Sequence, residues 1–265
     1  MASVVNAAGD LHVRVVSRRL VQASDESLVP RVLAVSNLDL LPQSMQVSML
    51  CVYPKPSSIA GGFDFDDVVA AFVSGLPDFL NHFFPFAGRL VANPVSGLPE
   101  IHCNNQGAEL VVGEVGVALA SLDYGTMGAS LRKIQLPHGK DVALSVQVVS
   151  FACGGFTVAW ATDHALVDGH ALCMIVTACP MVGVTAFAAF SLDTDFGFGD
   201  AAMAMPTTAA GRARLCSAFV QIVARPGGGD GSWIASALIW PRLAAALETD
   251  ERHIFKPVTA KYLGL

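Results

Sequence analysis

The residues of this chain that could perform chemistry gather in one short stretch, TDHALVDG, at positions 162–169. His164 and Asp168 stand four residues apart, and Gly169 closes the stretch. A histidine has a pKa near neutrality, so its imidazole can accept a proton from a hydroxyl or an amine. These residue types predict a general base, with His164 as the catalytic candidate.

Three other interpretations of this stretch compete with a general base. The sequence has no G-x-S-x-G elbow, so a serine hydrolase is not supported. A metal site could use Asp163, His164, Asp168 and His170, but no second His/Asp cluster elsewhere completes it, so no metal is expected. A purely structural role is the third alternative, because H-x-x-x-D spacing alone is common by chance.

The stretch lies between two apolar segments that must position it. Residues 142–152 and 156–162 are apolar at nearly every position and flank a Cys-Gly-Gly turn, which predicts a hairpin inside a covered sheet. The second of these strands carries His164 at its end, where functional side chains are commonly placed. Residues 170–178 then predict a buried helix that ends at Pro180.

Other elements are predicted along the rest of the chain. Asp64 is expected to cap an amphipathic helix whose apolar stripe runs from Val68 to Leu80. Pro241 begins a short predicted helix. Alternating or apolar runs predict further strands at 11–22, 45–56, 99–103 and 108–112, and a second hairpin at 215–226 and 232–240.

The overall composition excludes some functions. The net charge is −6 and the basic residues are scattered, so the chain lacks the basic face that a nucleic-acid-binding protein needs. The six cysteines form no C-x-x-C pair, which favours free thiols in a reducing compartment. No signal peptide is recognised at the N-terminus, so a cytoplasmic location is expected.

One uncharged run could be long enough to cross a membrane. Residues 171–190 carry no charge, but Pro180 and Gly183 interrupt the run near its centre. Acidic residues also lie close on both sides of it. The run is therefore expected to be a broken segment of the protein core, with no membrane span.

Four segments together resemble the plant BAHD acyltransferases, which use coenzyme A thioesters. DHALVDGHAL (163–172) is similar to the family's HxxxDG motif, and NHFFPFAGR (81–89) to its N-H-F-x-P-x-A-G-R element. The segment 35–56, VSNLDLLPQSMQVSMLCVYPKP, is also similar to the family. DFGFG (195–199) resembles the second signature, DFGWG, with Phe198 in place of tryptophan. The resemblance covers nearly all of residues 11–263.

The resemblance implies a fold and a division into domains. The fold class would be α/β, a chloramphenicol-acetyltransferase-like fold with a mixed β-sheet and flanking helices. Residues 1–179 would form the N-terminal domain with HxxxDG, and residues 180–265 a remnant of the second domain with DFGFG. In the family most of the second domain separates the two signatures, whereas here only residues 169–194 do. A large internal segment is therefore expected to be missing at about 179–181.

The resemblance also implies a mechanism and partners. His164 would deprotonate the hydroxyl or amine of a small-molecule acceptor, which attacks the carbonyl of an acyl-CoA co-substrate, with no metal or other cofactor. Asp168 and Gly169 would be structural, as would the five residues of the second signature, Asp195, Phe196, Gly197, Phe198 and Gly199. The alternative is a catalytically inactive truncated relative that acts as a binding or regulatory partner. The chain would be a monomer or associate through exposed apolar surface.

Overall fold

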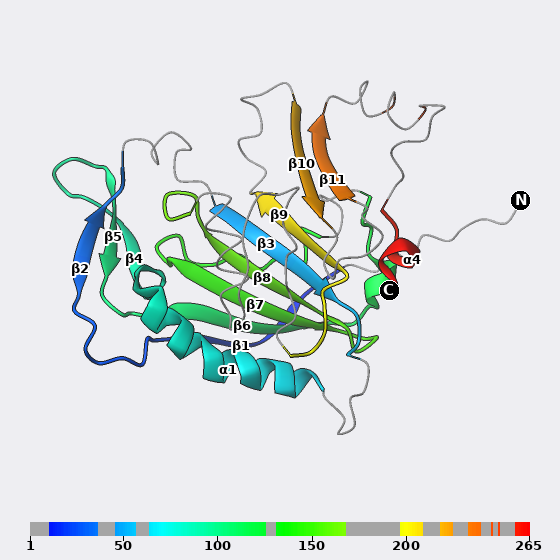
Figure 1. The fold of residues 1–265 in the computed structure, drawn as a ribbon, viewed down its shortest axis with the longest axis horizontal. Helices are drawn as coiled ribbons and strands as arrows, with labels where there is room; N and C mark the ends of the chain where they lie inside the picture. The colour runs from blue at the N-terminus through cyan, green and yellow to red at the C-terminus, as the bar shows by residue number, and fades with distance from the viewer. Residues whose placement is uncertain are drawn as a thin grey trace, which may run out of the picture.

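A mixed six-stranded sheet forms the centre of the molecule (Figure 1). Its strand order is β1-β6-β7-β8-β3-β9, with β6 and β7 parallel and the other neighbours antiparallel. The strands are β1 (Arg14–Val21), β3 (Gln46–Tyr53), β6 (Ala108–Val115), β7 (Leu144–Phe151), β8 (Phe156–Asp163) and β9 (Met203–Thr208). The computed structural model describes residues 11–36, 46–56, 64–125, 131–167, 197–208, 218–224, 233–239, 245, 249 and 258–265.

The hairpin of β7 and β8 confirms the strongest strand prediction. The two strands pair along their length, and every residue of β8 is buried. Gly154 adopts a φ of +81° in the turn, which favours glycine. A β-carbon on Gly155 would lie only 2.9 Å from the carbonyl oxygen of Tyr53, so the turn also needs a small residue for close packing.

Helix α1 (Phe65–His82) lies across one face of this sheet (Figure 1). The Asp64 carboxylate accepts hydrogen bonds from the backbone N–H groups of Asp66 and Asp67, and the Asp67 carboxylate accepts one from the Asp64 N–H. The predicted cap and apolar stripe are therefore confirmed. The buried residues of the helix are Val68, Phe72, Leu76, Phe79 and Leu80.

A small antiparallel sheet of order β2-β5-β4 accompanies the main sheet. It contains β2 (Arg31–Ala34), β4 (Arg89–Ala92) and β5 (Pro99–Cys103), and the 3-10 turn η1 (Phe84–Ala87) precedes β4. A β-carbon on Gly88 would lie 2.4 Å from the carbonyl oxygen of His102, so only glycine fits there. The buried Arg89 donates from Nη1 to the carbonyl oxygens of Gly88 and Gly107, at 2.7 and 2.8 Å. These contacts give the FAGR segment a structural role.

Strand β1 differs from the predicted pattern. In the strand predicted at 11–22, the alternation would place Val13 and Val15 on one face, but only Val13 is buried and Val15 is 42% exposed. The side chains of residues 14–20 are exposed on both faces of the strand, and the register shifts between Val15 and Ser17. Strand β1 is also an edge strand, so its outer surface lacks a neighbour within the described sheet.

The remaining described elements lie toward the C-terminus. Strands β10 (Ala218–Ala224) and β11 (Trp233–Ile239) pair as the second predicted hairpin, and α4 (Ala260–Leu263) packs near η2 (Leu119–Ser121).

Cys51 and Cys103 are buried free thiols, as expected, while Cys153 in the hairpin turn is exposed. No helix in the described ranges is long and apolar enough to cross a membrane. The helix predicted at 170–178 lies outside the described residues. Of the helix predicted after Pro241, the structure describes Ala245, which is helical, and Thr249, whose N–H donates to the Ala245 carbonyl oxygen at 3.1 Å.

Candidate functional site: a polar cleft beside the end of strand β8

The two faces of the central sheet have different side chains. The face toward α1 is apolar and includes the fully buried Trp160, which contacts the rings of Phe72 and Phe79. The opposite face is apolar near β9 but carries polar side chains toward the end of β8. These polar residues are Arg18, Gln46, Ser48, Glu109, Ser145, Gln147 and Asp163.

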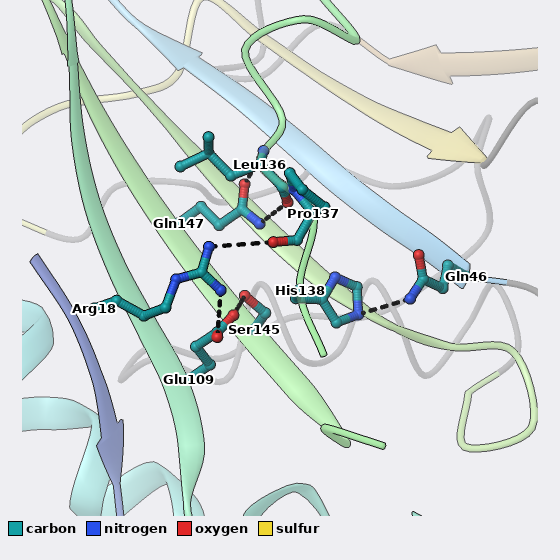
Figure 2. A network of polar contacts seen from close by, with 8 residues as sticks. All are labelled: Arg18, Gln46, Glu109, Leu136, Pro137, His138, Ser145 and Gln147. Carbon is teal, nitrogen blue, oxygen red and sulfur yellow. Dashed lines mark hydrogen bonds and ion pairs between the residues drawn. The ribbon is translucent and has the colours of Figure 1, made fainter. Parts of the chain in front are cut away.

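Gln147 fixes a chain segment, residues 131–138, over this polar region. Its side-chain oxygen accepts a hydrogen bond from the Leu136 N–H at 2.7 Å, and its amide group donates to the Leu136 carbonyl oxygen. The Gln135 amide donates to the Ser48 hydroxyl at 3.0 Å. Figure 2 shows Gln147 reaching from β7 to Leu136. Two glutamines therefore join the segment to two different strands of the sheet.

A second set of polar contacts lies next to Gln147 (Figure 2). The Glu109 carboxylate is buried and pairs with Arg18 Nη1 at 2.5 Å. It also accepts a hydrogen bond from the Ser145 hydroxyl at 2.8 Å. Arg18 donates in addition to the carbonyl oxygen of Pro137 at 3.2 Å. The buried negative charge of Glu109 is thus compensated by one cation and one hydroxyl.

The fixed segment and the sheet enclose a cleft of about 240 Å³. Arg132 lines the cleft, and its buried Nε has no hydrogen-bond partner in the described structure. The other lining residues are Gln46, Val47, Ser48, Gln135, Leu136, Pro137, His138, Gln147, Ala159 and Ala161.

His138 is the titratable imidazole of this cleft. Its Nε2 lies 3.4 Å from the amide nitrogen of Gln46, which can only donate, so the neutral ring accepts there. Burial lowers the pKa of His138, and the carboxylates of Glu109 and Asp163 oppose this effect while Arg18 adds to it. His138 is therefore neutral at physiological pH.

His164 follows directly after the last residue of β8. The Asp163 carboxylate accepts a hydrogen bond from the Ala165 N–H at 2.8 Å, and the Asp163 carbonyl accepts one from the Leu166 N–H at 3.0 Å. The Thr162 hydroxyl donates to the Ala143 carbonyl oxygen at 2.6 Å. These bonds fix the turn that carries the half-buried His164. His164 does not line the cleft, although Asp163 is the backbone partner of the cleft residue Gln46.

The second signature is described only in part. Gly197 and Gly199 have φ values of +93° and +95°, and Phe198 between them is buried. The Phe198 ring makes edge contacts with Tyr53 and Phe156, at centroid distances of 5.4 and 5.3 Å. These contacts place Phe198 against β3 and β8. The candidate residues Asp168, Gly169, Asp195 and Phe196 lie outside the described residues.

The cleft residues were not found by motif-based reasoning. Their signal in the sequence is a single polar residue inside an apolar strand, such as Ser48 in QVSML and Gln147 in SVQVV. In a strand covered on both faces, such a residue must find a polar partner inside the protein. Within the described ranges, no group of three or more His, Cys, Asp or Glu side chains could hold a metal ion.

Comparison with known proteins places the chain among plant acyltransferases. It is 30% identical over 128 residues to a spermidine coumaroyl-CoA acyltransferase of Arabidopsis thaliana, which covers 45% of this chain and 28% of the relative. It is 33% identical over 165 residues to putrescine hydroxycinnamoyltransferase 1 of Oryza sativa subsp. japonica, covering 60% of this chain and 36% of the relative. The matches thus span about a third of the length of these relatives.

A solved structure extends the likeness to the fold. The crystal structure of vinorine synthase superposes with a TM-score of 0.52 at 23% identity, over 63% of this chain and 42% of that chain. This likeness confirms the predicted chloramphenicol-acetyltransferase-like α/β fold. The Transferase family matches residues 11–186, about two thirds of the chain. The chain therefore belongs to the Transferase family, the BAHD acyltransferases.

Proposed function

We propose that this protein transfers an acyl group from an acyl-CoA thioester to the hydroxyl or amine of a small metabolite, with His164 as the general base. The observation that carries the proposal is the position of His164, on a hydrogen-bonded turn at the end of a buried strand. This turn lies inside the segment matched by the family. The names of the relatives include a coumaroyl-CoA donor and the amines spermidine and putrescine as acceptors.

The proposed reaction needs a single proton-transfer group. His164 takes a proton from the acceptor while the acceptor oxygen or nitrogen forms a bond to the thioester carbonyl carbon. The carbon–sulfur bond then breaks, and the electron pair leaves with the CoA thiolate. A thiol has a pKa of about 8.5, so this leaving group departs readily and no metal or covalent intermediate is required.

The two signatures would have structural roles in this proposal. Asp168 and Gly169 would be structural residues of the first signature, while the DFGFG loop (195–199) would support β3 and β8. The packing of Phe198 on Tyr53 and Phe156 and the positive φ values of its two glycine neighbours support that role for the loop. The N-terminal domain would comprise residues 1–179 and the second-domain remnant residues 180–265.

A second candidate function is a binding or regulatory partner without catalytic activity. The observation that favours it is the short distance in sequence between the signatures, since only residues 169–194 separate Asp168 from Asp195. If the segment that lies between them in the family is missing, much of the CoA pocket would be missing with it. The His164 turn would then be retained as a structural element only.

An activity assay on the full chain separates the two candidates. The purified protein is incubated with a panel of acyl-CoAs and with alcohol and amine acceptors, and release of CoA thiol is measured. We expect turnover that falls by roughly 100-fold or more in His164→Ala, the scale of a lost general base. His12→Ala, at an exposed histidine outside the site, is the matched control and should retain full activity.

The outcome of this assay is decisive in both directions. Turnover that depends on His164 and not on His12 supports the transferase. A folded protein that releases no CoA thiol over the whole panel favours the binding partner. A protein that is equally active with His164→Ala rejects the proposed role of His164.

A further inference from the structure

The Arg132 side chain is the unexplained group of the cleft. Its Nε is buried and has no hydrogen-bond acceptor, and within the described residues Arg132 forms no ion pair with a carboxylate. A buried guanidinium nitrogen without an acceptor is costly, because its hydration is lost and nothing replaces it. Fork-shaped guanidinium groups match carboxylates particularly well. The site therefore has one strong donor without an acceptor.

The carboxylates near the cleft are already engaged by other groups. Glu109 is paired with Arg18 and bonded to Ser145. The Asp163 carboxylate accepts a hydrogen bond from the backbone of Ala165. Since burial favours the neutral form of His138, Arg132 is the charged side chain among the residues that line the cleft. A molecule that binds there meets the guanidinium of Arg132 and the neutral amides of Gln46 and Gln135.

The cleft lies next to the strand end that carries His164. Ala159 and Ala161 of β8 line it, and Gln46 lies opposite Asp163 in the register of β3 and β8. His164 is the next residue after Asp163. A small molecule seated on Ala161 and Gln46 would therefore lie at the same end of β8 as the turn that carries His164.

We infer that this cleft selects an acceptor that carries a carboxylate, and that Arg132 is the residue that binds this group. The inference rests on the proposed acyl transfer and specifies its acceptor class. An acceptor with a cationic chain would place like charge against Arg132. The relatives named for spermidine and putrescine act on amines of that kind, so the specificity of this chain would differ from theirs.

Direct binding of three phenols of similar size tests the inference without any acyl-CoA. The probes are anionic 4-hydroxybenzoate, neutral 4-hydroxybenzamide and cationic tyramine, and isothermal titration calorimetry on the full chain measures their affinities. We expect 4-hydroxybenzoate to bind at least roughly tenfold more tightly than the amide, as one charge-assisted pair implies, and tyramine to bind most weakly.

Two neighbouring substitutions remove the same charge from different places. Arg132→Gln should abolish the preference for the anionic probe. Lys133→Gln should retain it, because Lys133 is exposed and does not line the cleft. Arg132→Lys should retain part of it, since the charge remains but the fork is lost. Circular dichroism and thermal unfolding show whether each variant is folded.

The binding data overturn the inference if the wild-type protein does not prefer the anion, or if Arg132→Gln and Lys133→Gln reduce the preference equally. Failure of acyl transfer gives a different result, namely selective binding of 4-hydroxybenzoate without His164-dependent release of CoA thiol. If the protein both prefers the anionic probe and transfers acyl groups, a turnover assay should show that Arg132→Gln raises KM for the anionic acceptor much more than for the neutral one.

Discussion

The two faces of the central sheet use the same strands for different purposes. On β8, Trp160 points into the aromatic core under α1, whereas its neighbour Ala161 lines the polar cleft. On β7, Val146 and Val148 belong to the apolar core, while Gln147 between them holds the segment 131–138. The comparison teaches that burial alone does not distinguish the faces, since both are largely buried. The faces differ in the kind of contact. The face toward α1 is held by apolar packing, and the cleft face by specific hydrogen bonds.

Replacing neighbouring residues of β8 should give the largest difference between the faces. Trp160→Ala removes a fully buried ring packed on Phe72 and Phe79, and should lower the free energy of unfolding by about 3–5 kcal/mol. Ala161→Ser, on the cleft side of the same strand, should cost less than about 1 kcal/mol. Urea unfolding measures both values. Equal costs at the two positions would contradict the assignment of the apolar core to the α1 face.

The polar contacts should have an intermediate effect that is local. Gln147→Leu keeps a side chain of similar size but leaves the N–H and carbonyl of Leu136 without their partners. We expect the free energy of unfolding to fall by about 2 kcal/mol. This is the low end of the cost of leaving two backbone groups unpaired, because Leu136 is half-buried and water can replace part of the contact. Hydrogen exchange should show faster exchange over residues 131–138.

The matched control is Gln106→Leu, at an exposed glutamine in the loop between β5 and β6. It should change neither stability nor exchange in residues 131–138. If Gln147→Leu leaves exchange there unchanged, the segment is held by other contacts and the cleft does not depend on Gln147.

The smallest expected effect is a pH dependence of stability at His138. Because burial lowers the pKa of His138 in the folded protein, the unfolded chain binds a proton more readily. The contribution of the neutral ring to the free energy of unfolding is fully present above the ordinary histidine pKa of 6.5. It is lost as the pH falls through the lower pKa that His138 has in the folded protein. His138→Gln should therefore gain stability relative to the wild type between about pH 7 and pH 5.

Thermal or urea unfolding at several pH values measures this difference. The charged groups that act on His138 are Glu109, Asp163 and Arg18. A stability difference that stays constant from pH 7 to pH 5 would show that His138 is protonated equally in both states.

Much of the local structure followed from the sequence. Asp64 with Asp67 three residues later marks the start of α1, and the Cys-Gly-Gly turn marks the β7–β8 hairpin. Both signals are local, because a capping box and a tight turn depend on residues within a few positions of each other. The HxxxDG stretch, together with three further segments, likewise indicated the family and the candidate base, His164.

The tertiary structure decided which residues form the cleft. Gln46, Arg132, His138 and Gln147 come from three separate parts of the chain, and only the pairing of β3, β8 and β7 brings them to one place. The face on which a strand residue lies depends on register, and register is set by pairing with a distant strand, as in the pairing of β1 with β6. The sequence by itself thus determined the elements and the family. The close approach of β5 to Gly88, the partners of Glu109 and the unpaired Nε of Arg132 depend on contacts between distant segments, which no local pattern specifies.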